Sequence, residues 1–341
     1  MSRFGAHRRK VIVSAGVVVL LLLAASRWVH GEYHSAGPLA EARVVLVAKG
    51  SGLRQISRQL LDAGAISSSS IFVLVTRIKG DSRFLRAGEY RLGAGVSMAQ
   101  IVEILKSDKV VLHPITIAEG LLSRKVAAIL NDSDLLSGPP VSPPDEGTLL
   151  PDTYLVRRGD GRAETLARMT DDMTAYLEQA WPKRQPNLPF GTVKEAVILA
   201  SIIEKETALA EERPHIAGVF TNRLRKNMRL QSDPTVIYGL IKAAGGEELL
   251  GRDLTRADLA TAGPYNSYMD KGLTPTPICN PGRAAIDAAL RPLKTDDLYF
   301  VASGDRDSEG RPTGSHNFAQ TLAEHRKNVR KWRAKGSSLT R

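Results

Sequence analysis

The sequence predicts an α+β protein with an N-terminal transmembrane helix, a small α+β subdomain and a larger mixed α+β domain. Three observations support this fold class. An apolar run occupies residues 11–25, short strand-like segments mix with helical periodicity over residues 43–108, and long helical patterns alternate with proline-rich stretches after residue 145. At 341 residues the chain is long enough to form two domains, each with its own core.

The N-terminal apolar run has the features of a membrane anchor. Residues 1–10 contain four Arg or Lys residues and no acidic residue, and residues 11–29 form the predicted span. Positive charges before a span keep the N-terminus in the cytoplasm. We therefore expect a single-pass inner-membrane protein whose residues after about 30 face the periplasm. A cleaved signal peptide is the alternative, because residues 24–26 are small, but Arg27 directly after them favours a retained anchor.

The charge balance predicts an anionic partner. The formal net charge is +11, which suits nucleic acid, phospholipid or an acidic polymer. Because nucleic acid is not expected in the periplasm, the membrane and an acidic polymer remain as the candidate partners. The single cysteine, Cys279, excludes an internal disulfide, and no Cys/His cluster has the spacing of zinc ligands. We therefore expect neither a metal nor another cofactor.

Residues 43–108 have the pattern of a compact α+β subdomain. Its expected elements are two strands, 43–47 and 84–92, with helices near 53–61 and from the serines at 67–70 to about 78 between them. Ser97 and Gln100 form a capping box that opens one more helix. The strand–helix–helix–strand order resembles the sugar-binding LysM domain. A purely structural spacer is the alternative.

The remaining chain divides into a connection, a large domain and a tail. Residues 109–145 are expected to form a strand at 110–117, a short helix and a proline-rich loop at 136–144. The larger domain, residues 146–330, should contain helices at 163–179 and 193–209, and irregular proline-rich segments between 231 and 292. Residues 331–341 form a basic tail that either contacts an anionic surface or frays as a solvated helix end.

The helix expected at 193–209, VKEAVILASIIEKETAL, carries the candidate chemistry. Apolar or small residues cover nearly its whole circumference, so the helix should be buried with its glutamates. Small residues surround Glu204 one turn away, which would let a ligand approach it, whereas Glu206 projects into the isoleucine arc. Burial raises the proton affinity of a carboxylate, as a general acid requires. The alternative is an internal ion pair of either glutamate with Lys205, Arg213 or Arg223, and the periodicity does not decide between them.

Two later segments are rich in groups that bind a polar, extended ligand such as a glycan. They are RLQSDPTVIY, residues 229–238, and PYNSYMDKGLTPTPICN, residues 264–280. Amide, hydroxyl and phenol groups are concentrated there on backbone constrained by proline and glycine. Ordinary turns, in which Asp and Asn satisfy backbone groups, are the alternative for any one residue.

These motifs together resemble the YceG-like endolytic murein transglycosylases. The resemblance rests on LPDTY (150–154), ASIIEKET, NRL (222–224), MRLQSDPTVIYGL, PYNSY, the YFVA strand and HNFAQTLAEH, and it extends from the anchor to Val329. It implies an inner-membrane protein with a LysM-like subdomain and a periplasmic catalytic domain at residues 146–330. The implied reaction cleaves the bond between N-acetylmuramic acid (MurNAc) and N-acetylglucosamine (GlcNAc) in nascent peptidoglycan and leaves 1,6-anhydro ends. The resemblance also implies that the first glutamate of E-K-E-T, Glu204, is catalytic, and peptidoglycan synthases follow as candidate partners.

A lytic transglycosylase needs only one carboxylate, because the C6 hydroxyl of the sugar replaces water as the nucleophile. In this hypothesis Glu204 donates and then recovers the proton. The residues expected to bind the sugars are Tyr154, Gln231, Ser232, Tyr265 and Asn266. Asp233 and Glu206 could assist. An ionised Asp233 near the scissile bond would permit hydrolysis, although Asp233 is interpreted as a turn-capping residue before Pro234. A non-enzymatic, membrane-tethered peptidoglycan-binding scaffold is the competing class of function.

Overall fold

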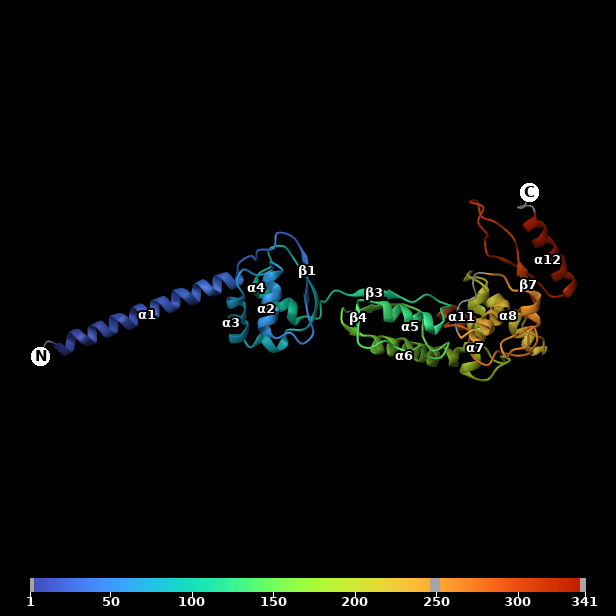
Figure 1. Ribbon diagram of the computed structural model, residues 1–341, viewed down its shortest axis with the longest axis horizontal. Helices are drawn as coiled ribbons and strands as arrows, with labels where there is room; N and C mark the ends of the chain where they lie inside the picture. Colours follow the sequence, from blue (N-terminus) through green and yellow to red (C-terminus); the bar gives the residue numbers. More distant parts are fainter. Residues whose placement is uncertain (1–2, 246–251, 338–341) are drawn as a thin grey trace. The chain divides into compact units, whose positions relative to one another are not determined.

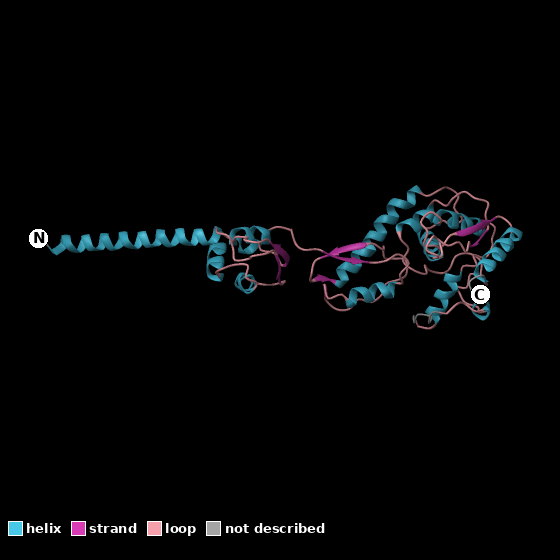
Figure 2. Cartoon of the chain, turned by 90° about the horizontal axis from the view of Figure 1, so that it is seen from above, coloured by secondary structure: helices cyan, strands magenta, loops and turns pink. Residues whose placement is uncertain are grey.

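The computed structural model describes residues 3–245 and 252–337, and the chain forms two compact units (Figure 1). Unit 1 comprises residues 1–113 and 155–160, and unit 2 comprises residues 114–154 and 161–341. Helices predominate in both units and the strands are short (Figure 2). The protein is therefore a mixed α+β protein with an N-terminal apolar helix.

Helix α1 (Arg3–His34) is long and apolar enough to cross a membrane. Its apolar segment, Ile12–His34, has 23 residues and would extend about 34 Å at 1.5 Å per residue. Side chains from Ile12 to Trp28 are exposed. Near the end of α1, Tyr33 is buried in the core of unit 1, so the last turn of the helix is part of that unit.

Unit 1 is built on the antiparallel pair of β1 (Arg43–Val47) and β2 (Gly88–Leu92). Its helical elements are α2 (Leu53–Asp62), α3 (Ser69–Ile78), the 3-10 helix η1 (Asp81–Phe84) and α4 (Met98–Lys106). The capping box of Ser97 and Gln100 is confirmed at the start of α4. The strand expected over 84–92 is shorter than predicted, because residues 81–84 form η1 instead.

Unit 2 holds most of the remaining helices. These are α5 (Ser123–Asp132), α6 (Arg162–Ala180), the 3-10 helix η2 (Trp181–Lys183), α7 (Val193–Glu206), α8 (Arg213–Arg225), α9 (Asp233–Ala243), α10 (Arg256–Ala260), α11 (Arg283–Leu290) and α12 (Leu322–Ser337). The antiparallel pair β7 (Tyr299–Ala302) and β8 (His316–Ala319) packs against α12. Four short strands form two further pairs. Strand β3 (His113–Thr116) pairs with β5 (Thr153–Val156), and β4 (Leu136–Ser137) pairs with β6 (Asp160–Gly161).

Helix α7 lies at the centre of unit 2 and packs against α8, α9 and α11. Its residues from Ala196 to Ile203 are all buried, as the sequence pattern predicted. The apolar residues of α11 and α8 that meet it include Ile286 and Phe220. The buried run ends at Ile203, so Glu204 and Glu206 follow it in the last turn of the helix.

One expectation for the second half of the chain is wrong. The stretch between residues 231 and 292 is not irregular throughout, since α9, α10 and α11 lie within it. Pro234 is compatible with α9 because it occupies the first turn, where no backbone N–H is needed. In addition, α12 continues past residue 330 to Ser337, so the basic tail begins inside a helix, and Lys335 binds the carboxylate of Asp305 at 2.7 Å.

Candidate active site

Helix α7 ends at Glu206, one of its two candidate glutamates. Thr192 and Glu195 form a capping box at the start of the helix, and the helix ends at Glu206, one turn earlier than the sequence pattern predicted. Thr207 has extended backbone angles, with φ −144° and ψ 137°. Glu206 is therefore the last helical residue and lies in the turn that follows the buried run of α7.

Glu206 lies in a cavity of about 420 Å³. The hydroxyl of Ser232 donates a short hydrogen bond to Oε1 of Glu206. The lining comes from α7, α8, the 230–233 segment, the PYNSY motif, β7, β8 and α12 and combines polar, aromatic and aliphatic side chains, namely Glu206, Arg223, Leu230, Gln231, Asp233, Tyr268, Phe300, Val301, Ala302, His316, His325, Val329 and Trp332. A volume of this size can take part of an extended polar ligand such as a sugar.

Burial raises the pKa of Glu206 to about 7, far above the ordinary 4.5 of a glutamate. The negative charge of Asp233 raises this pKa further, while the hydrogen bond from Ser232 and the charge of Arg223 oppose the shift. The position of Glu206 at the negative end of the α7 dipole also disfavours an ionised carboxylate. Glu206 can therefore hold a proton close to neutral pH, as a general acid must.

Ser267 holds the turn that presents Ser232. The Ser267 hydroxyl accepts a hydrogen bond from the backbone N–H of Ser232 at 2.9 Å and bonds the Thr235 hydroxyl at 2.8 Å. Its carbonyl accepts from the backbone N–H of Gln231 at 3.1 Å. Gln231 has a φ of 52°, in the left-handed region that non-glycine residues seldom adopt. Strained backbone of this kind is typical of functional sites.

Arg223 binds the backbone of the segment that leads into the turn at Ser232. Its Nη1 donates to the carbonyl oxygens of Arg229 and Leu230 at 3.1 and 2.8 Å, and its Nε donates to the carbonyl of Leu298 at 2.6 Å. Nη1 also reaches Oε1 of Gln231 at 3.3 Å. These hydrogen bonds direct the guanidinium to carbonyl and amide oxygens, so Arg223 supports the turn from inside.

A second carboxylate, Asp233, lines the same cavity. Its Oδ1 accepts a hydrogen bond of 2.6 Å from the hydroxyl of Tyr268. Asp233 is the first residue of α9 and is exposed. The sequence pattern predicted a turn-capping role for Asp233; in the structure its side chain joins the PYNSY segment to the cavity that contains Glu206.

Glu204 has a different environment. Its Oε1 accepts a hydrogen bond from Nη2 of Arg213 at 3.0 Å, and its Oε2 accepts one from the backbone N–H of Gly282 at 2.8 Å. Nη2 of Arg213 also reaches Glu119 at 3.3 Å. Only 4% of the Glu204 side chain is exposed. Burial raises the pKa of Glu204, whereas Gly282 and Arg213 oppose that shift.

The expectation that small neighbours leave Glu204 open to a ligand is not met. Its small neighbours on α7 allow Arg213 and the segment around Gly282 to approach, so protein groups occupy the space that a sugar would need. The ion pair that the sequence left open as an alternative is the one observed. Glu204 is therefore enclosed by protein groups, whereas Glu206 lies at a cavity.

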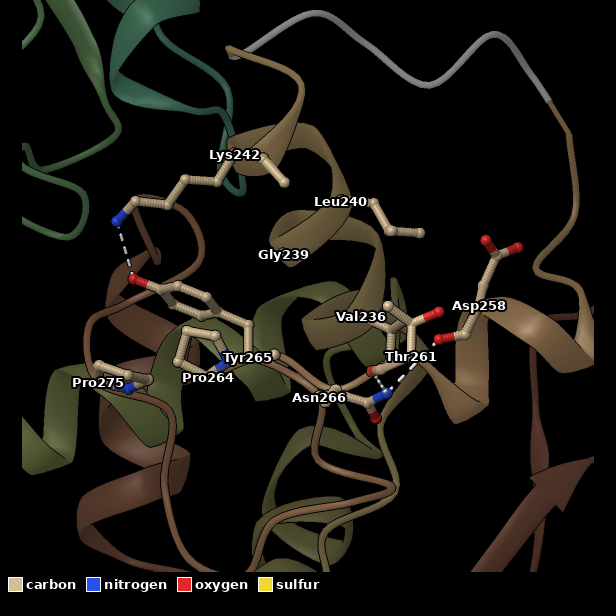
Figure 3. A pocket seen from close by; sticks show the side chains of 13 residues that line it. Val236, Gly239, Leu240, Lys242, Asp258, Thr261, Pro264, Tyr265, Asn266 and Pro275 are labelled. Carbon is tan, nitrogen blue, oxygen red and sulfur yellow. Dashed lines mark hydrogen bonds between the residues drawn. The ribbon is translucent and has the colours of Figure 1, made fainter.

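Of the expected sugar-binding residues, Gln231 and Ser232 lie beside Glu206 and the other three lie elsewhere. Tyr154 is buried, and its hydroxyl donates to the carbonyl of Leu150 at 2.7 Å. Tyr265 and Asn266 line a separate, mainly apolar pocket of about 570 Å³ beside α9 (Figure 3).

Within that pocket both side chains are engaged by the protein. The hydroxyl of Tyr265 accepts from Nζ of Lys242 at 2.9 Å (Figure 3) and bonds the Thr276 hydroxyl at 2.8 Å. The amide nitrogen of Asn266 donates to the carbonyls of Leu259 and Thr261 at 3.1 and 2.7 Å. Asn266 thus satisfies backbone groups of nearby turns, which is the alternative left open by the sequence, whereas Tyr265 binds the side chains of Lys242 and Thr276.

Sequence reasoning missed several residues of the cavity. Ser267 and Tyr268 belong to the same PYNSY motif as Tyr265 and Asn266, but composition does not show which of these side chains faces α7. His316 and His325 come from HNFAQTLAEH, and Trp332 was assigned to the tail. His316 is held by Glu212, whose Oε2 lies 2.6 Å from Nδ1. The pairing of β8 with β7 and its packing against α12 bring this motif to the cavity.

Comparisons with known proteins agree with the motifs. The model of the YceG-like family matches residues 45–331. The chain is 32% identical over 318 residues to an endolytic murein transglycosylase of Bacillus subtilis (strain 168), covering 84% of this chain and 83% of that protein. It is 27% identical over 369 residues to an endolytic murein transglycosylase of Streptococcus pneumoniae (strain D39 / NCTC 7466), covering 93% of this chain but only 65% of that protein.

Among solved structures, a YceG-like protein from Listeria monocytogenes is 30% identical and matches 84% of this chain and 99% of its own, with a TM-score of 0.48. Because the family model covers most of the sequence, the chain belongs to the YceG-like family.

Proposed function

We propose that this protein is an endolytic transglycosylase that cleaves the glycan strands of peptidoglycan. The observation that carries the proposal is the protonatable carboxylate of Glu206 in a polar cavity, where the QSDP and PYNSY motifs of the family meet. The relatives at 32% and 27% identity are named endolytic murein transglycosylases, which supports the same substrate and reaction.

The cavity suggests how one carboxylic acid performs both proton transfers. Glu206 donates its proton to the oxygen that links MurNAc to the next sugar, and the C1–O bond breaks. The resulting carboxylate takes the proton from the C6 hydroxyl of the same MurNAc, whose oxygen bonds to C1 and closes the 1,6-anhydro ring. Because that hydroxyl is tethered to the reacting ring, its effective concentration exceeds what free water can offer.

The neighbours of Glu206 have distinct roles in this proposal. Ser232 fixes the carboxylate through Oε1, and Gln231, exposed at the same cavity, offers an amide for a sugar hydroxyl. Tyr154, Tyr265 and Asn266 support the surrounding loops, since their polar groups already bind the protein. Glu204 joins α7 to Arg213 and Gly282.

The rest of the chain suggests where this activity takes place. Helix α1 anchors the protein in the inner membrane, and the basic residues before it favour a cytoplasmic N-terminus and a periplasmic catalytic domain. Within unit 1, the order β1–α2–α3–β2 with an antiparallel strand pair supports a LysM-like, glycan-binding role for residues 43–108. Work on nascent strands would bring the protein close to peptidoglycan synthases and would terminate strand elongation.

Muropeptide release from purified peptidoglycan tests the proposal. The full-length protein in detergent should release fragments with 1,6-anhydro ends, detected by mass spectrometry, and Glu206→Gln should release none. A protein that binds the polymer and sediments with it but releases nothing would instead be the non-enzymatic scaffold.

A further inference from the structure

The cavity holds two carboxylates, although the proposed reaction uses one. Glu206 and Asp233 line the same space, and the adjacent residues Ser232 and Asp233 each join a different partner. The Ser232 hydroxyl binds Glu206, and the Asp233 carboxylate receives the hydroxyl of Tyr268 at 2.6 Å. The turn at 232–233 thus contacts Glu206 through Ser232 and places Asp233 at the same cavity.

A second carboxylate beside the reacting sugar usually makes a glycosidase hydrolytic. In such enzymes it activates water or attacks C1 itself, while the first carboxylic acid protonates the leaving oxygen. Asp233 is exposed to solvent at the cavity, so water can reach it. A structural feature must therefore keep Asp233 from helping water if anhydro ends are to be the product.

Tyr268 is fixed in place to restrain Asp233. Its backbone N–H donates to Oδ1 of Asn266 at 2.9 Å, and the amide nitrogen of Asn266 is bound by backbone carbonyls. On the other side, Ser267 binds the backbone of Ser232. The Tyr268 hydroxyl is thus presented to Asp233 by a turn whose polar groups are satisfied, and its hydrogen bond to Oδ1 fixes the direction in which the carboxylate faces.

We propose that Tyr268 is a positioning residue that decides between lytic and hydrolytic cleavage by holding the Asp233 carboxylate. This inference rests on the proposed function. Bound to Tyr268, Asp233 keeps its negative charge facing the oxocarbenium-like state and stabilises it electrostatically. It does not accept a proton, and the C6 hydroxyl of MurNAc closes the ring.

Without the Tyr268 hydroxyl, water competes with the C6 hydroxyl of MurNAc for C1. Glu206 still gives its proton to the leaving oxygen as the C1–O bond breaks. A water oxygen then bonds to C1 and its proton passes to Asp233, which returns it to solvent, while Glu206 is reprotonated from solvent. The product is a reducing MurNAc end, heavier than the anhydro end by one water.

Product analysis of Tyr268→Phe tests this step. Full-length wild type and variants in detergent are incubated with purified peptidoglycan, and anhydro and reducing ends are counted by mass spectrometry. Tyr268→Phe should keep cleaving, and its reducing fraction should rise at least about tenfold, since general-base assistance contributes about 10²- to 10⁴-fold. Tyr176→Phe is the matched control, because it removes a hydroxyl from α6 that binds the Arg283 carbonyl at 3.4 Å, and its products should equal those of wild type.

Asp233→Asn supplies an independent arm. The amide retains an acceptor for Tyr268 but loses the charge, so turnover should fall at least about tenfold while the products stay anhydro. The double variant Tyr268→Phe with Asp233→Asn should also give anhydro ends, because the base that serves water is gone.

Several outcomes would overturn the inference. These are an unchanged anhydro fraction in Tyr268→Phe, a folded Tyr268→Phe that cleaves nothing, or an Asp233→Asn variant that works at the wild-type rate or makes reducing ends. If Tyr268→Phe does not fold, the two results for Asp233→Asn decide alone. Failure of the proposed function looks different, since wild type itself would then release no anhydro ends or Glu206→Gln would match wild type.

Discussion

The hydroxyl of Ser232 donates a hydrogen bond to the carboxylate of Glu206, joining two family motifs 26 residues apart in the chain. The contact exists because α7 ends at Glu206 and α9 begins at Asp233, so the last residue of one helix meets the residue before the other. Both the orientation and the protonation of the proposed acid depend on this meeting point.

The raised pKa of Glu206, about 7, predicts how activity depends on pH. Only the protonated acid can donate to the glycosidic oxygen, so kcat/KM for peptidoglycan should fall tenfold per pH unit above about 7. Asp233→Asn removes a negative charge that raises this pKa, so the falling limb should move to lower pH. A rate that is flat between pH 6 and pH 9 would contradict the assignment.

The same shift predicts a pH-dependent stability. Between pH 4.5 and about 7, folded Glu206 keeps a proton that the unfolded chain releases, so the free energy of unfolding falls as pH rises. In Glu206→Gln the free energy of unfolding should not fall in this way, because the glutamine side chain does not titrate. The variant should match wild type near pH 4.5 and exceed it at pH 8 by up to about 3 kcal/mol in denaturant unfolding. A constant difference across this range would show that Glu206 is not buried as described.

Glu204→Gln should lower the free energy of unfolding of the protein. Removing the charge from a side chain that is 4% exposed leaves the buried Arg213 with only the weaker contact to Glu119. We expect a loss of about 1–3 kcal/mol in the free energy of unfolding. Glu119→Gln is the control, because that side chain is 42% exposed and should cost less than about 1 kcal/mol. Equal losses from both variants would argue against a dominant Glu204–Arg213 pair.

Asn280 makes a further stability prediction. Its fully buried side chain accepts from the backbone N–H groups of Gly147 and Leu149 at 3.0 Å and donates to the carbonyl of Leu121 at 3.1 Å. Asn280→Ala leaves the two N–H groups unpaired, while the Leu121 carbonyl keeps its bond from the backbone N–H of residue 280. The substitution should cost about 3 kcal/mol, measured by denaturant unfolding. Asn328→Ala, which loses one partly exposed bond of 3.4 Å, should cost less than about 1 kcal/mol.

Local patterns predicted the helices of unit 1 together with α6 and α7, but not α9, α10 and α11. The capping box at Ser97 and the burial of α7 follow from residues within a few positions of one another, so propensity and periodicity suffice. The environments of the glutamates could not be predicted in this way. The partners of Glu204 are Arg213 and Gly282, and the partner of Glu206 is Ser232, all from segments that a helical wheel of α7 does not contain.

The same limit explains the sugar-binding residues. The sequence identified PYNSY as important, but Tyr265 and Tyr268 differ only in which pocket they face, and tertiary contacts set that choice. Asn266 looks like a ligand-binding amide by composition, yet backbone carbonyls use its donors. Segment-level predictions were therefore more successful than residue-level ones.

The most direct test compares Glu206→Gln with Glu204→Gln in release of anhydro-muropeptides from purified peptidoglycan, at a temperature where circular dichroism shows both variants folded. The account predicts that Glu206→Gln releases none, while Glu204→Gln, though less stable, retains cleavage within about tenfold of wild type. Loss of cleavage in folded Glu204→Gln together with wild-type release by Glu206→Gln would contradict the account and assign the acid to Glu204.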